Sequence, residues 1–209
     1  MEISEIKLYK QAYRLSLFTI GYNLLEGIVS IILGYNDKTL TLFGFGIDSF
    51  IEVMSGIGIA IMIVRMKQNP DTPKSTFEIN ALKITGTAFY LLSAGLLAGI
   101  VLNLIHHQKP ESTFWGVIIS LLSIAVMLWL MLAKKAIGKK LHSEPILADS
   151  NCTKICIYMS VVLLVASLIY ELTGFVYADI IGAAGLVYFS FSEGKEAFET
   201  AKGNGCTVC

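Results

Sequence analysis

Six long apolar runs follow one another along this chain, and each is long enough to cross a lipid bilayer. A helix of about 20 apolar residues spans the roughly 30 Å hydrocarbon core of a membrane. Only 15% of the residues are charged, compared with about a quarter in soluble domains. The sequence therefore predicts an all-α integral membrane protein with six transmembrane helices, over residues 12–35, 40–65, 79–105, 113–133, 146–170 and 175–192.

The distribution of basic residues predicts the orientation. Thirteen Lys and Arg residues lie at the termini and in the second and fourth connections with their flanks, whereas the opposite loops offer only Lys38 and Lys109. Lys and Arg collect on the cytoplasmic side of membrane proteins. We therefore expect both termini in the cytoplasm of a multi-pass protein, in the plasma membrane of a prokaryote.

Little of the chain is left for a soluble domain. We expect a cytoplasmic lead-in over residues 1–11, a membrane domain over residues 12–195 and a cytoplasmic tail over residues 196–209. The first ten residues lack the long apolar stretch and cleavage site of a signal peptide. Zero net charge argues against a nucleic-acid partner. The sequence also offers no pairing of a nucleophile with a base that would indicate an enzyme, so we do not expect one.

Two pairs of possible metal ligands lie within the apolar runs at helical spacing. Asp48 and Glu52 are four residues apart, and so are Cys152 and Cys156. This spacing places each pair on one face of a helix. Ionisable groups at membrane depth are costly and usually functional, and two carboxylates one turn apart repel unless a cation or proton lies between them. We expect the pairs to meet across two helices and to bind a metal ion.

Further polar residues lie at membrane depth, among them Asn23, Glu26 and Lys154. Lys154 lies off the face of the cysteine pair. It could neutralise Glu26 or Asp149, lower the pKa of the thiols, or extend to the cytoplasmic interface. We favour a role as charge partner.

Three segments resemble the cation diffusion facilitator, or cation efflux, family. Residues 45–56, FGIDSFIEVMSG, resemble its second span, which carries a His/Asp-x-x-x-Asp metal pair. Residues 148–156, ADSNCTKIC, resemble its fifth-span motif A-D-A-x-H-x-x-S-D, and Tyr177-Ala178-Asp179 is similar to the W-x-D-P that opens its sixth span. The resemblance implies six spans, a homodimer and exchange of a metal cation for protons.

The departures from the family pattern bear on the ion. Glu52 replaces the usual Asp, Cys152 stands where His is usual, and Cys156 stands where Asp is usual. Thiolates favour zinc, cadmium and copper(I) over magnesium, calcium and manganese, and two carboxylates with two thiolates suit a tetrahedral zinc-type site. We therefore expect Zn²⁺, Cd²⁺ or Cu⁺ as the transported ion and no other cofactor.

Family members commonly carry a cytoplasmic domain after the sixth span, and we expect this chain to lack it. Its tail instead ends in a CxxC formed by Cys206 and Cys209. The tail either captures soft metals in passing or is an end without a role.

Two other functions stay open. The chain could bind or sense metal in the membrane without transporting it. It could also be a membrane thiol redox protein that uses Cys152 and Cys156 or the terminal CxxC.

Overall fold

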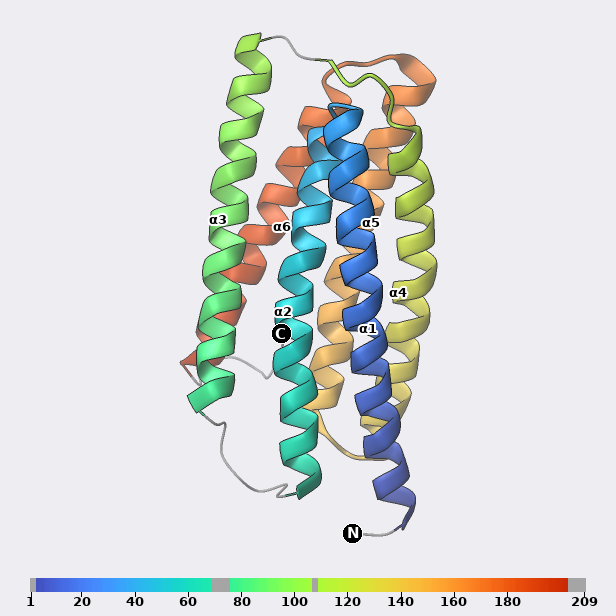
Figure 1. Cartoon of the computed structure of the whole chain (residues 1–209), viewed down its shortest axis with the longest axis vertical. Coiled ribbons are helices and arrows are strands. Elements are labelled where there is room, and N and C mark those ends of the chain that lie inside the picture. The colour runs from blue at the N-terminus through green and yellow to red at the C-terminus, as the bar shows by residue number, and fades with distance from the viewer. Residues whose placement is uncertain (1–2, 69–75, 107–108, 203–209) are drawn as a thin grey trace.

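Six long α-helices make up the protein in a computed structural model that describes residues 3–68, 76–106 and 109–202. No strand occurs in these ranges. The helices alternate in direction along one long axis (Figure 1). They are α1 (Ile3–Asn36), α2 (Leu40–Gln68), α3 (Thr76–His106), α4 (Phe114–Lys140), α5 (Glu144–Thr173) and α6 (Ala178–Ala201).

Five helices, α1 to α5, are long and apolar enough to cross a membrane, judged by length and composition among the described residues. The sixth helix, α6, contacts α3 in the same bundle and crosses it obliquely in Figure 1. The predicted all-α membrane protein is confirmed. We call the end of the bundle where α1 begins the inner end, because the Lys and Arg residues that collect there predict that it faces the cytoplasm.

The helices form two groups. α1, α2, α5 and α4 contact one another in a closed ring, with the most extensive contacts between α1 and α2 and between α4 and α5. α3 and α6 pair with each other and contact the ring mainly through α2 and α5. In Figure 1 α3 stands at one side of the bundle, and α6 crosses obliquely behind α3 and α2.

Some boundaries differ from the sequence prediction. The basic stretch after residue 133 was expected to be a connection, but α4 continues through Lys140 and only Leu141–Ser143 separate it from α5. α6 likewise continues to Ala201 instead of ending at 192. Hydropathy marks where contact with lipid ends, whereas Lys and Glu are good helix formers and extend a helix beyond that point.

The outer ends of the helices are held together by polar contacts. The Asp179 carboxylate accepts hydrogen bonds from the backbone N–H groups of Leu40 and Thr41, at 2.8 and 3.0 Å. It thereby caps the N-terminus of α2, whose first N–H groups have no partner within the helix. The Glu111 N–H also donates to the Asp37 carbonyl at 2.8 Å, which joins the α1–α2 loop to the α3–α4 loop.

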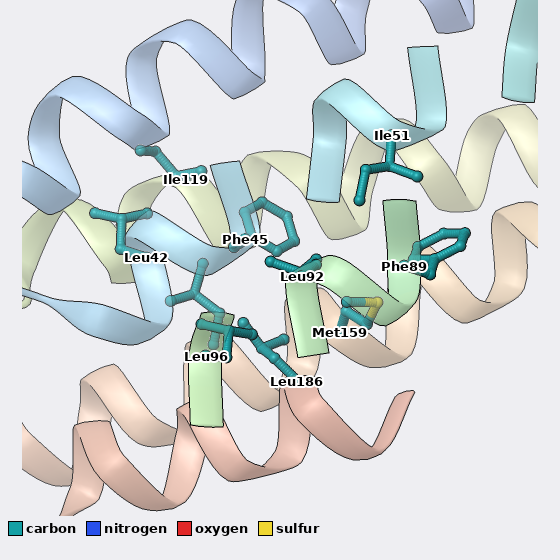
Figure 2. Close-up of a cluster of buried hydrophobic side chains, with 10 residues drawn as sticks. Leu42, Phe45, Ile51, Phe89, Leu92, Leu96, Ile119, Met159 and Leu186 are labelled. Atoms are coloured by element: carbon teal, nitrogen blue, oxygen red, sulfur yellow. The ribbon is translucent and has the colours of Figure 1, made fainter. Parts of the chain in front are cut away.

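A hydrophobic cluster fills the outer half of the bundle. Leu42 and Leu163 are fully buried in it, and Phe45 and Leu96 nearly so. Figure 2 shows Leu42, Phe45, Leu92, Leu96 and Leu186 gathered between the ribbons. A second cluster, which includes Tyr9, Ile63 and Ile146, lies near the inner end. Between the two clusters the helices carry polar side chains.

Candidate metal site

The four predicted ligands line one cavity in the membrane domain. Asp48 and Glu52 reach it from α2, and Cys152 and Cys156 reach it from α5. The cavity has a volume of about 50 Å³, which is room for a metal ion or about three water molecules. The two pairs thus lie on two different helices, α2 and α5, and line one cavity, as expected if they approach each other.

The carboxylates of α2 are buried. Asp48 is only 2% exposed, and its Oδ1 has no hydrogen-bond partner in the described part of the chain. Glu52 accepts a hydrogen bond at 2.8 Å from the Asn23 side-chain amide of α1. Unpaired buried carboxylate oxygens cost free energy, so Asp48 presents an acceptor that a cation or proton can satisfy.

The two cysteines of α5 differ in state. Cys156 is a free, partly buried thiol that donates to the Cys152 carbonyl oxygen at 3.5 Å. It lies close enough to Glu52 and Asp48 for their charges to interact with it. Cys152 is partly buried and disulfide-bonded. Since a thiolate is the metal ligand, Cys152 must be reduced before it can take part in a four-ligand site.

The side chains do not yet surround an ion. Within residues 3–68, 76–106 and 109–202, no three His, Cys, Asp or Glu side chains are grouped as they stand to hold a metal ion. Zinc needs oxygen ligands at about 2.0–2.2 Å and thiolates at about 2.3 Å. The candidate ligands therefore share a cavity, and they must rotate toward its centre to coordinate an ion.

Lys134 and Asp149 form a buried ion pair in the cavity wall. The Lys134 ammonium lies 2.9 Å from the Asp149 carboxylate and donates to the Thr153 hydroxyl at 3.1 Å. Lys134 is 3% exposed and Asp149 is 7% exposed. Helix α4 starts at the outer end of the bundle, and Lys134 lies 20 residues, or about 30 Å, further along it toward the inner end. The ion pair therefore lies at the inner end of the cavity.

The expected role of Lys154 was wrong. Its side chain is exposed, with the ammonium 5.5 Å from the centre of the Tyr158 ring. Asp149 has Lys134 as its ion-pair partner. Glu26 instead accepts hydrogen bonds from the Tyr22 hydroxyl at 2.8 Å and the Ser49 hydroxyl at 3.2 Å. The exposed Lys154 therefore forms no ion pair with either carboxylate among the described residues.

Sequence reasoning missed two charged residues of the cavity wall, Lys134 and Glu193. Each directly follows an apolar run and was placed outside the predicted span. A signal was available, since Lys134 shares a helix face with the buried Met127 and Leu130 at i−7 and i−4. Glu193 stands in the same relation to the buried Leu186.

The other predicted accessory ligands, Cys206 and Cys209, lie outside the described residues. Whether the terminal CxxC binds metal stays a prediction.

Comparison with known proteins agrees with this picture. Residues 15–202 match the cation efflux transmembrane domain. The chain is also 28% identical over 176 residues to a protein of Methanocaldococcus jannaschii that is named as an uncharacterized transporter. This similarity covers 82% of the chain and 61% of the length of that relative. The domain match includes both candidate ligand pairs and reaches from α1 to the end of α6. The chain therefore belongs to the cation efflux family.

Proposed function

We propose that this protein exports a soft or borderline metal cation, such as Zn²⁺, Cd²⁺ or Cu⁺, in exchange for protons. Asp48, Glu52, Cys156 and reduced Cys152 would bind the ion. The observation that carries the proposal is their position around one cavity, together with the buried Asp48 oxygen that has no partner among the described residues. Membership of the cation efflux family supports the same class of cargo.

The charges of the site favour exchange of the metal for protons. Buried carboxylates need either a cation or a proton. Thiols and carboxyl groups lose protons when they bind a metal. A metal that arrives from the cytoplasm therefore displaces protons, and protons that arrive from outside displace the metal.

The packing of the bundle supports access to the site from the cytoplasm. The outer half of the bundle is filled by the cluster around Leu42, Phe45 and Leu186 (Figure 2). The cavity lies on the inner side of that cluster, and its wall extends to Lys134 and Asp149. This arrangement corresponds to a carrier that is closed toward the outside, and transport requires the bundle to rock around the site.

Metal flux in proteoliposomes tests the proposal. We expect saturable Zn²⁺ or Cd²⁺ uptake that requires a proton gradient, measured under reducing conditions because of the state of Cys152. Asp48→Asn and Cys156→Ser should each lower this flux by about tenfold or more, since each removes a proposed ligand. Glu111→Gln is the matched control, because Glu111 is an exposed carboxylate of the outer loop and its loss should leave flux unchanged.

Two results would contradict this function. Stoichiometric metal binding without flux would show a binding or sensing protein. Absence of metal binding in the reduced protein would remove the site altogether.

The homodimer implied by the family resemblance is a further proposal, tested by the mass of the purified protein in detergent. A prokaryotic plasma membrane agrees with the archaeal origin of the relative, and fractionation of the native cells tests it.

A further inference from the structure

Glu193 of α6 is a buried carboxylate that the four-ligand site does not use. It is 5% exposed, and it lines the same cavity as Asp48, Glu52 and Cys156. Within the described ranges the structure gives its side chain no hydrogen bond and no ion pair. An ionised group buried in a membrane without a partner is costly, and such groups usually serve a function.

The level of Glu193 in the bundle matches that of the site. Asp179 binds the first N–H groups of α2, so α6 and α2 start at the same level. Glu193 lies 14 residues beyond Asp179, about 21 Å along its helix, and Glu52 lies 12 residues beyond Leu40, about 18 Å along its own. The two carboxylates are therefore within one helical turn of each other in depth.

The neighbours of Glu193 are the candidate ligands themselves. Asp48, Glu52 and Cys156 line the same cavity as Glu193. The nearby cation, Lys134, is already paired with Asp149 at 2.9 Å. Three carboxylates thus face one cavity with no ion-pair partner among the residues described.

We infer that Glu193 is a further cation-binding residue, which contributes a carboxylate from α6 to the site on α2 and α5. This inference rests on the proposed function, since it assigns one more ligand to the same cation. The unpartnered Asp48 oxygen points to a missing positive charge, and Glu193 supplies an oxygen that such a charge attracts. It is also a ligand that does not depend on the reduction of Cys152.

The inference has a mechanical consequence. Glu193 belongs to the α3/α6 pair, whereas Asp48, Glu52 and Cys156 belong to the ring of α1, α2, α4 and α5. A cation held by both groups draws them together, and its release lets them separate. Occupancy of the site would then be linked to the relative position of the two groups.

Glu193→Gln and the matched control Glu199→Gln test this role. Both changes neutralise a glutamate of α6, but Glu199 is exposed. Zn²⁺ affinity is measured by calorimetry on the reduced full-length protein in detergent, and the midpoint of thermal unfolding is measured without metal. We expect Glu193→Gln to weaken Zn²⁺ binding by about tenfold or more and to leave the metal-free midpoint equal or higher, because the Glu193 side chain has no hydrogen bond or ion pair among the described residues that the change would remove. Glu199→Gln should change neither quantity.

Three outcomes would overturn the inference. Unchanged Zn²⁺ affinity in Glu193→Gln, beside a wild-type protein that binds, would refute it and leave the proposed function intact. A lowered metal-free midpoint with weaker binding would show a structural role. Failure of the reduced wild type to bind Zn²⁺ and, in the same assay, Cd²⁺ and Cu⁺ would refute the proposed function, and the inference with it.

Discussion

At the scale of single residues, Lys134 and Asp149 are the clearest example of buried charges that are stable only as an ion pair. Both side chains are buried and they lie 2.9 Å apart. Transfer of either charge from water into a protein interior costs several kcal/mol, and attraction between the two offsets this cost only while both are present. The hydroxyl of Thr153 accepts a further hydrogen bond from the ammonium.

Removal of one partner should therefore be worse than removal of both. We expect Lys134→Met to lower the free energy of unfolding by about 3–5 kcal/mol, because it leaves the buried Asp149 carboxylate unpaired. Lys134→Met combined with Asp149→Leu should recover most of that loss, since apolar residues of similar size can replace a buried pair. Denaturant unfolding in detergent measures both variants, and an additive loss in the double variant would contradict the expectation.

At the scale of helices, close approach depends on glycines at particular contacts. A Cβ atom at Gly34 of α1 would lie 2.5 Å from the backbone nitrogen of Phe43 in α2. Such a contact is impossible without moving one of the two helices. At Gly95 of α3, which is exposed, a Cβ atom would meet nothing within 4 Å. The first glycine is required by helix packing, and the second is not.

Alanine at the two positions should have opposite effects. Gly34→Ala should destabilise the protein by about 1–3 kcal/mol, as overpacking does in other tightly packed sites. Gly95→Ala should leave stability unchanged or raise it by up to about 1 kcal/mol, because alanine favours a helix interior over glycine. Thermal unfolding in detergent compares them, and equal effects at both positions would show that the α1–α2 contact is looser than the structure indicates.

The helices and the charged residues that they carry differ in how far they could be predicted from the sequence. The five apolar helices could be predicted because hydropathy is a local property, and the i, i+4 spacing placed Asp48 with Glu52 and Cys152 with Cys156 on one helix face each. That these two pairs bind a metal stays a prediction. Lys134 and Glu193 were harder to predict, because each directly follows an apolar run and was read as its end, although each continues an apolar face of its helix. The contact between Asn23 and Glu52 joins residues 29 apart in the sequence. Only the packing of α1 on α2 decides that such a pair meets.

For the molecule as a whole, the sealed outer half and the inner cavity predict one-sided access to the site. Cys156 is a free thiol in the cavity wall. In a variant with the other three cysteines changed to Ser, we expect a small charged methanethiosulfonate to modify Cys156 faster from the cytoplasmic side than from the outside. Bound metal should slow the reaction. Vesicles of the two orientations provide the comparison, and faster modification from the outside would show that the outer cluster does not close the resting protein.

The polar character of α6 bears on how the protein is made. Unlike α1 to α5, α6 is not among the helices apolar enough to qualify as a span by itself, and each carboxylate near the centre of a helix costs about 2.5–3.5 kcal/mol during insertion by the translocon. Asp179 is satisfied by the N-terminus of α2, and α6 packs on α3. Both partners are synthesised before α6 leaves the ribosome. Helix α6 thus enters a bilayer in which its binding surface already exists, and the order in which α2, α3 and α6 are synthesised becomes part of the folding pathway.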